Sequence, residues 1–240
     1  MLKNQNSKKN IWVIGFPKSG NTWLSYLLSF SFNLRYIDYD DDLKTPKKKW
    51  IKNFTSGTLN HKSLKDYSYV KKTHKQKRGI LNTNDYIFYI KRDPRDVYVS
   101  YNYFMKQKSS GFLGKIKYFI IGLFGKKNRI RWFFKKWQNH IEFWENDSII
   151  IDYEDLLKYG HKYLYKKIKS LEKDIEINII KEAIENFKFK KLSNGRSPGQ
   201  EDNKNFFRKG ISGDWKNKLS NQEKEEFKRL INRSNFQYDF

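Results

Sequence analysis

The chain of 240 residues is long enough for one domain with a full hydrophobic core, and it contains no cysteine. Disulfides, thiolate metal sites and a cysteine nucleophile are therefore excluded. The formal net charge of +24, from 50 lysines and arginines against 26 acidic residues, favours polyanionic partners such as nucleic acid, an anionic membrane or a charged nucleotide. A compositional bias toward lysine, asparagine and isoleucine explains the excess equally well, so the charge alone does not identify a partner.

Residues 1–10 are polar and basic, and no long apolar run follows them. We therefore expect a flexible N-terminal segment rather than a signal peptide or a membrane span, and a single domain over residues 11–240. This composition favours a cytoplasmic enzyme. Four histidines without close spacing give no indication of a metal site.

Residues 15–23, with the sequence GFPKSGNTW, lie between a β-favouring run at 11–14 and an apolar run with helical spacing at 23–30. A glycine loop between a strand and a helix is a common site for phosphate or sulfate, because the helix N-terminus has backbone N–H groups without partners. The loop contributes two glycines, a cation and two hydroxyls, from Gly15, Gly20, Lys18, Ser19 and Thr22. Taken alone, the same pattern also suits an ordinary turn with a surface lysine.

The rest of the chain alternates strand-like and helix-like segments. Residues 38–65 are polar without a sustained period and predict surface loops with a short helix. Further strands are predicted at 69–74, 86–92 and 148–153, and helices at 96–106, 132–146, from 154–157 onward, 175–187 and 221–232. Residues 193–205 predict a loop, and Ser220 with Glu223 predicts a capping box at the last helix.

This alternation predicts an α/β fold with a central parallel β-sheet flanked by helices on both faces. Ligands in such folds bind at the carboxyl ends of the strands, and polar clusters around Lys18, His74 and Arg92 each follow a predicted strand. Cations and one titratable base recur there without a carboxylate pair, at Lys18, Lys72, His74, Arg92, Arg208 and Lys209. Such a set favours transfer of an anionic group without a metal. Arg92 and Arg95 at a helix start are either simple surface charges or, because they oppose the helix dipole, an indication of a bound anion nearby.

Residues 111–127 are apolar, interrupted by glycine and flanked by lysine. Two interpretations stay open. The segment is either a lid or core-covering helix over a substrate pocket, or a helix that contacts a membrane interface peripherally through residues 112–124.

Three long motifs, at residues 17–23 (PKSGNTW), 92–101 (RDPRDVYVSY) and 207–217 (FRKGISGDWKN), resemble motifs of the cytosolic-type sulfotransferases. That family uses 3′-phosphoadenosine-5′-phosphosulfate (PAPS) as its donor. Residues 72–74 (KTH) resemble the segment with the family's catalytic base, and residues 153–156 the segment with its adenine-contacting tyrosine. The matches follow the family's order along most of the chain.

The resemblance implies a P-loop nucleotide-kinase-like sulfotransferase fold, PAPS as co-substrate, 3′-phosphoadenosine-5′-phosphate (PAP) as product, and no metal. It implies direct in-line transfer, with His74 as general base and with Lys18 and Lys72 stabilising the transferred group. The residues that it places around the donor are Pro17, Lys18, Ser19, Gly20, Asn21, Thr22, Trp23, Arg92, Ser100, Tyr153, Phe189, Phe207, Arg208, Lys209 and Gly210.

Within this set, the resemblance assigns the 5′-phosphosulfate to the first loop. It assigns the 3′-phosphate to Arg92, Ser100, Arg208, Lys209 and Gly210, and the adenine to Trp23, Tyr153 and Phe189. Asn21 and Phe187 depart from the family, which usually has threonine or serine at both positions. The family's C-terminal dimer motif is not recognisable in residues 219–227, so the oligomeric state stays open.

The acceptor is expected to be a hydroxyl, less readily an amine, on a small molecule, a glycan or a lipid-linked compound. Residues 40–61 and 109–129, which should shape its pocket, resemble no assignable substrate site. Two other functions stay open: a P-loop kinase, although the loop lacks the usual final Gly-Lys-Ser/Thr, and a protein that binds polyanions or membrane surfaces through its basic charge. No specific nucleic-acid partner is expected.

Overall fold

The computed structural model describes residues 9–42, 67–108, 125–171 and 174–239. The chain divides into two compact units. Unit 1 comprises Met1–Lys91 and Phe143–Lys188, and unit 2 comprises Arg92–Glu142 and Phe189–Phe240.

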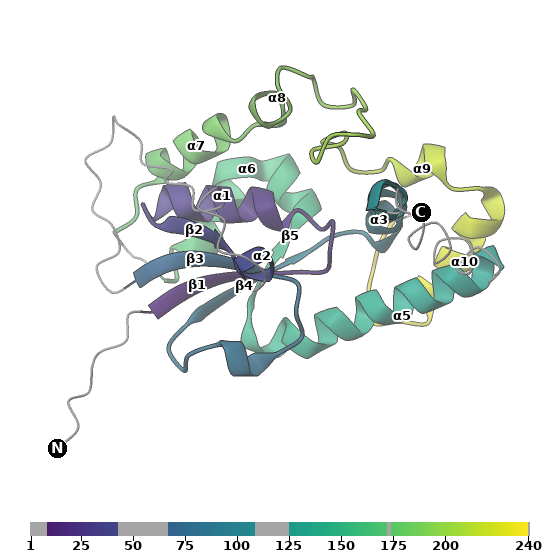
Figure 1. The fold of residues 1–240 in the computed structure, drawn as a ribbon, viewed down its shortest axis with the longest axis horizontal. Helices are drawn as coiled ribbons and strands as arrows, with labels where there is room; N and C mark the ends of the chain where they lie inside the picture. The colour runs from purple at the N-terminus through teal and green to yellow at the C-terminus, as the bar shows by residue number, and fades with distance from the viewer. Residues whose placement is uncertain (1–8, 43–66, 109–124, 172–173, 240) are drawn as a thin grey trace. The chain divides into compact units, whose positions relative to one another are not determined.

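The described part of unit 1 contains a parallel sheet with the strand order β2-β3-β1-β4-β5 (Figure 1). The strands are β1 (Lys9–Ile14), β2 (Arg35–Asp38), β3 (Tyr67–Thr73), β4 (Tyr86–Lys91) and β5 (Ile149–Asp152). The α/β class with a central parallel sheet is therefore confirmed. Strand β2 was not predicted, because four residues that begin with an exposed arginine and end with an aspartate carry too weak an apolar signal.

Three helices of unit 1 lie on one face of this sheet (Figure 1). They are α1 (Asn21–Ser31), α6 (Tyr153–Ile168) and α7 (Ile177–Asn186), and α7 contacts both of the others. Unit 1 also contains the short helix α2 (Tyr39–Asp42) and the 3-10 turns η2 (Arg78–Ile80) and η3 (Glu145–Asp147).

The apolar centres of β1 and β4 form the core of this unit. Phe88 and Ile90 are fully buried, and the Trp12 side chain is buried with its Nε1 donating to Asp85 Oδ2 at 2.7 Å. Helix α1 is buried on nearly all sides, which explains why its apolar run shows little amphipathic contrast. The position of the loop between β1 and α1 is therefore fixed by packing on both sides.

Unit 2 is helical in its described part. Its helices are α3 (Pro94–Lys108), α5 (Lys126–Trp144, whose last two residues belong to unit 1), α8 (Phe189–Leu192), α9 (Trp215–Lys218) and α10 (Asn221–Asn232). Helices α3, α5 and α10 pack through Tyr98, whose ring lies 5.1 Å from that of Phe133 and 5.5 Å from that of Phe227. The capping box of Ser220 and Glu223 is present as predicted.

Helix α5 begins at Lys126, six residues before its predicted start at 132, because its first turn is polar and gives no periodic signal. Of residues 111–127, for which the lid and membrane-contact interpretations stay open, residues 111–124 lie outside the described part of the chain. Among the described residues, none of the helices is both long and apolar enough to cross a membrane.

Candidate active site

The loop between β1 and α1 has a backbone that only particular residues allow. A Cβ at Gly15 would lie 2.5 Å from Asn21 Oδ1 and 2.7 Å from the Ile90 carbonyl oxygen, so no side chain fits there. Lys18 has φ of 74° and Gly20 has φ of 103°, both in the left-handed region. Left-handed residues that alternate with right-handed ones turn successive backbone N–H groups toward one side, which is the geometry of an anion-binding nest. The strained φ at Lys18 is typical of functional loops.

The same loop leads into the N-terminus of α1, where no side chain caps the helix. Ser19 is 1% exposed, and its hydroxyl has no hydrogen-bond partner among the described residues. The Asn21 Nδ2 atom donates to the Phe16 carbonyl oxygen at 3.0 Å and so stabilises the loop. The asparagine, where the family usually has threonine or serine, therefore has a structural role here. Backbone dipoles, a buried hydroxyl and Lys18 are the groups from which anion-binding sites are commonly built.

His74 follows β3 directly and contacts the anion loop. Its Nδ1 lies 2.8 Å from the Gly15 carbonyl oxygen. A carbonyl oxygen only accepts, so Nδ1 carries the proton and the lone pair of the neutral ring lies on Nε2. The predicted meeting of polar clusters at the strand ends is confirmed for β1 and β3, whose last residues Ile14 and Thr73 are register partners. Arg92 belongs to unit 2 and is described there.

Lys72 is buried and ion-paired. Its Nζ lies 2.5 Å from Asp38 Oδ2, and the two side chains are 8% and 9% exposed. Asp38 is the register partner of Lys72 across β2 and β3. The positive charge of Lys72 is therefore balanced by a carboxylate that sequence reasoning missed, because the residues at 38–42 read only as a polar loop.

Two of the three predicted adenine-contacting rings meet beside the loop. The Trp23 and Tyr153 rings lie 5.8 Å apart in an edge-to-face arrangement, and the Tyr153 ring would be 2.7 Å from a Cβ at Gly20. The Trp23 Nε1 atom donates to the Phe187 carbonyl oxygen at 3.0 Å. The Phe187 ring, at the second departure from the family, packs against Tyr26 and Phe30.

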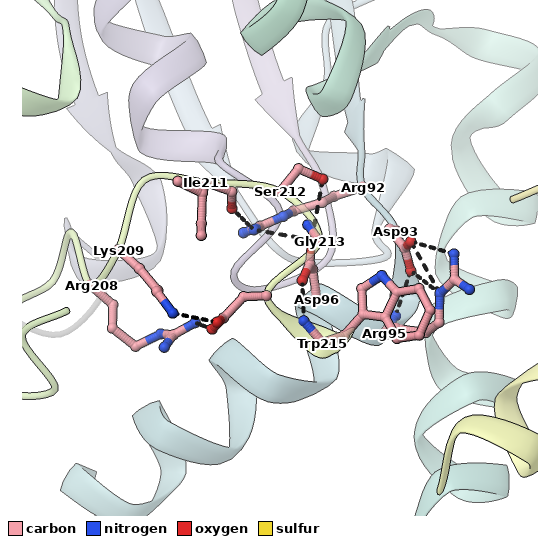
Figure 2. A network of polar contacts seen from close by, with 11 residues as sticks. Arg92, Asp93, Arg95, Asp96, Arg208, Lys209, Ile211, Ser212, Gly213 and Trp215 are labelled. Carbon is pink, nitrogen blue, oxygen red and sulfur yellow. Dashed lines mark hydrogen bonds and ion pairs between the residues drawn. The ribbon is translucent and has the colours of Figure 1, made fainter. Parts of the chain in front are cut away.

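In unit 2, Arg92 is buried and held by the C-terminal motif (Figure 2). Its Nη2 donates to the Ile211 carbonyl oxygen at 3.0 Å and lies 3.7 Å from Asp96 Oδ2. Asp96, which is 1% exposed, also accepts from the backbone N–H groups of Gly213 at 2.7 Å and Trp215 at 3.0 Å. Sequence reasoning missed this role of Asp96, although it lies inside a recognised motif. Ser100, on the second turn of α3, is also buried.

Arg208 and Lys209 are engaged by carboxylates. Arg208 donates to Glu201 at 2.7 Å. Arg208 also donates to Asp214 at 2.6 Å, and Lys209 Nζ lies 2.5 Å from the same carboxylate (Figure 2). Burial of Asp214 opposes its ionisation, but hydrogen bonds from Lys209 and Arg208 outweigh burial and lower its pKa. The Arg208 Nε atom is buried and has no partner among the described residues, so one donor of this guanidinium stays available.

Arg95 is buried and paired with a carboxylate, so its place at the helix start does not by itself indicate a bound anion. Its guanidinium donates to both carboxylate oxygens of Asp93, with a shortest distance of 2.7 Å, and lies 3.8 Å from the centre of the Trp215 ring. Burial raises the pKa of Asp93, although the hydrogen bonds from Arg95 act in the opposite direction. The dipole argument from sequence did not include this adjacent carboxylate.

The loop that carries residues 207–210 is fastened by Arg196. Its guanidinium donates to the carbonyl oxygens of Phe207 at 2.6 Å, Arg208 at 2.8 Å and Gln200 at 3.0 Å. Gly210 has φ of 67°, and a Cβ there would lie 2.2 Å from the Phe189 ring. Arg196 was not predicted, since an arginine in a Gly-Ser-Pro-rich stretch gives no signal of long-range contacts.

The predicted site residues therefore form two groups. Residues 17–23, Lys72, His74 and Tyr153 belong to unit 1, where His74 and Tyr153 contact the β1–α1 loop and Lys72 pairs with Asp38. Arg92, Ser100, Phe189 and residues 207–210 belong to unit 2. Among the described residues, no group of three or more histidine, cysteine or acidic side chains is placed to hold a metal ion.

Comparison with known proteins identifies the family. A family model described as "Sulfotransferase domain" matches residues 8–237. The amine sulfotransferase of Oryctolagus cuniculus is 29% identical over 252 residues, covering 92% of this chain and 79% of that protein. Sulfotransferase 2A1 of Homo sapiens is 22% identical over 245 residues, covering 93% and 83%.

Solved structures give the same result for the fold. Mouse sulfotransferase SULT7A1, complexed with PAP, has a TM-score of 0.62 at 17% identity and covers 97% of this chain and 87% of that one. A retinol dehydratase in complex with androsterone and the inactive cofactor PAP has a TM-score of 0.54 at 18% identity, with 95% and 82% covered. With nearly its whole length matched by the family model, the chain belongs to the sulfotransferase domain family.

Proposed function

We propose that the protein transfers the sulfuryl group of PAPS to a hydroxyl group of an acceptor, in one in-line step that releases PAP. The observation that carries this proposal is the 2.8 Å hydrogen bond between His74 Nδ1 and the Gly15 carbonyl oxygen. This bond holds the imidazole that we propose as general base against the loop that we propose as the anion site. Support for the donor comes from the family and from the two similar structures, which contain PAP.

In the proposed step, the acceptor oxygen attacks the sulfur atom while the bond from sulfur to the bridging oxygen of the donor breaks. His74 Nε2 takes the proton of the acceptor hydroxyl. Lys18 and the amides at the start of α1, with Ser19 and Thr22, stabilise the charge that develops on the sulfuryl oxygens and on the leaving phosphate. Lys72 contributes positive charge, which its ion pair with Asp38 partly neutralises.

We further propose that unit 2 binds the 3′-phosphate through Arg92, Ser100, Arg208, Lys209 and the Gly210 amide. A phosphate there would compete with Asp214 and Glu201 for the guanidinium of Arg208 and the ammonium of Lys209. In unit 1, Trp23 and Tyr153 are proposed to contact the adenine, with Pro17 bordering the nucleotide. Phe189 and Phe207, in unit 2, keep the roles that the family resemblance implies.

The proposed acceptor is a small hydroxylated or amine-bearing molecule. Among the similar proteins, one is named an amine sulfotransferase and one was solved with androsterone. Glycan and lipid-linked acceptors, and a peripheral membrane contact through residues 112–124, stay predictions.

The test is to incubate the purified protein with radiolabelled PAPS and a panel containing androsterone, a simple phenol, an alkylamine and a fractionated cell extract. We expect a labelled product, loss of at least about 100-fold in rate for Lys18→Ala and His74→Ala, and PAP binding weakened about 10-fold or more for Arg92→Ala. Lys166→Ala and His161→Ala, on helix α6, are the matched controls and should keep the wild-type rate.

Failure to bind PAP, or magnesium-dependent turnover of ATP instead, would refute the proposal. His74→Ala with most of its activity would refute the assignment of the base alone.

A further inference from the structure

Asp40, on the short helix α2, binds the segment that carries the proposed base. Its Oδ1 accepts from the Thr73 hydroxyl at 2.7 Å, and its Oδ2 accepts from the His74 backbone N–H at 2.8 Å. The Thr73 hydroxyl oxygen in turn accepts from the Lys75 N–H at 3.2 Å. The carboxylate therefore holds Thr73 and His74 directly, and Lys75 through the Thr73 hydroxyl, at the end of β3.

These contacts fix the backbone of His74 at the point where it leaves the sheet. Strand β3 ends at Thr73, so the next N–H group has no strand partner in the ladder and needs another acceptor. Asp40 provides that acceptor with a charged group, which makes the stronger kind of hydrogen bond. Its side chain is only 23% exposed, which limits competition from water.

The backbone position decides which atoms of the His74 ring meet the anion loop. The ring reaches the Gly15 carbonyl oxygen through Nδ1 at 2.8 Å, and this bond places the proton on Nδ1. If the His74 backbone moved, Nδ1 would lose this acceptor and the ring would exchange between tautomers. Only the tautomer with its lone pair on Nε2 presents that nitrogen as the base.

We propose that Asp40 is a positioning residue for His74, fixing the backbone and thereby the tautomer of the general base. This inference rests on the proposed function for its kinetic consequence but not for its structural one. Asp40 acts through the peptide and the Thr73 hydroxyl, and we assign it no contact with donor or acceptor. Charged groups facing it include Lys75, whose Nζ lies 4.0 Å from Oδ1.

The first experiment needs no substrate. Histidine labelled with nitrogen-15 is incorporated, and the His74 signals are identified by their loss in His74→Gln. In the wild-type protein at a pH where the ring is neutral, we expect the chemical shifts of the Nδ1-protonated tautomer. In Asp40→Ala we expect them to shift toward the averaged values of an unrestrained imidazole, with Asp40→Asn intermediate because its amide oxygen still accepts one hydrogen bond.

The second experiment measures sulfate transfer to an acceptor that the panel above identifies. We expect Asp40→Ala to lower kcat about 10- to 100-fold, with the Kd of PAP changed less than about 2-fold. Combined with His74→Ala, Asp40→Ala should cause no additional loss, because its effect acts through the imidazole. Asp147→Ala, which removes an exposed ion pair with Arg78 in the same unit, is the charge-matched control.

An unchanged His74 tautomer in Asp40→Ala would overturn the inference, and so would a full additional loss of rate in the His74→Ala background. Absence of sulfate transfer by the wild-type protein would instead refute the proposed function, and the tautomer measurement would still test Asp40.

Discussion

Lys72 has a structural role beside the catalytic one that we propose for it. Its ammonium pairs with Asp38 where both side chains are buried. Removing one partner of such a pair leaves an uncompensated buried charge, which destabilises a protein by about 3–5 kcal/mol. A loss of activity in Lys72→Ala would therefore not show whether folding or catalysis had failed.

A double substitution separates the two roles. We expect Lys72→Met to lower the free energy of unfolding by about 3–5 kcal/mol, and Lys72→Met with Asp38→Asn to recover most of that loss, measured by urea denaturation. If the charge of Lys72 acts in the reaction, the double variant should be stable but should transfer sulfate more slowly than the wild type. Recovery of the wild-type rate would mean that Lys72 is structural only. Lys188→Met, in an exposed pair with Glu185, is the control and should change stability by less than about 1 kcal/mol.

At the scale of elements, one guanidinium makes several of the hydrogen bonds that hold the loop from Arg196 to Gly210. Arg196 donates to three carbonyl oxygens along this loop, including those of Phe207 and Arg208. A lysine at this position keeps the charge but cannot reproduce the planar fork. The fastened backbone presents Arg208 and Lys209, which we propose as ligands of the 3′-phosphate.

We therefore expect Arg196→Lys to raise the Kd of PAP about 10-fold, since hydrogen bonds of about 1–1.5 kcal/mol each are lost at the loop. The Kd of adenosine monophosphate, which lacks the 3′-phosphate, should change less than about 2-fold, and calorimetric titration measures both. Arg233→Lys, at the end of α10, is the matched control. Equal weakening of both nucleotides would show that Arg196 supports the fold in general rather than this phosphate site.

For the whole molecule, the excess of positive charge makes the buried and half-buried carboxylates important for acid stability. Burial of Glu201, Asp214 and Glu226 opposes their ionisation, but hydrogen bonds from lysine and arginine outweigh it and lower each pKa. A carboxyl whose pKa is lower in the folded state than in the unfolded state stabilises the fold when the pH is above its unfolded-state pKa of about 4. This stabilisation is lost as the pH falls through the folded-state pKa. Asp93 has the opposite sign, because burial raises its pKa.

We expect the free energy of unfolding to fall steadily as pH decreases from about 5 to 2, because the three lowered carboxyls outnumber the raised one. Asp214→Asn should be less stable than the wild type at pH 7, and the two curves should converge at low pH, where Asp214 is protonated. Urea denaturation at a series of pH values measures both. Parallel curves over the whole range would contradict the assigned role of the Asp214 pairs.

Features that depend on a few neighbouring residues were predictable from the sequence. The anion loop follows from Gly15, Lys18 and the start of a helix, and the capping box at Ser220 follows from a four-residue pattern. The buried strands β1 and β4 follow from continuous apolar runs. The order of long motifs indicated the family before any contact was known.

Only the tertiary structure decided which partners complete the site. Asp40 lies 34 residues before His74, and Asp38 meets Lys72 only through the register of β2 and β3. The sequence indicated no partners for Arg208 and Lys209, yet both pair with Glu201 and Asp214, and Arg95 pairs with Asp93. Local sequence encodes backbone conformation and residue chemistry, whereas the pairing of distant charges depends on strand register and packing that no short pattern records. The sequence by itself therefore determined the chemistry of the site, and the fold determined which carboxylates hold its cations and its base.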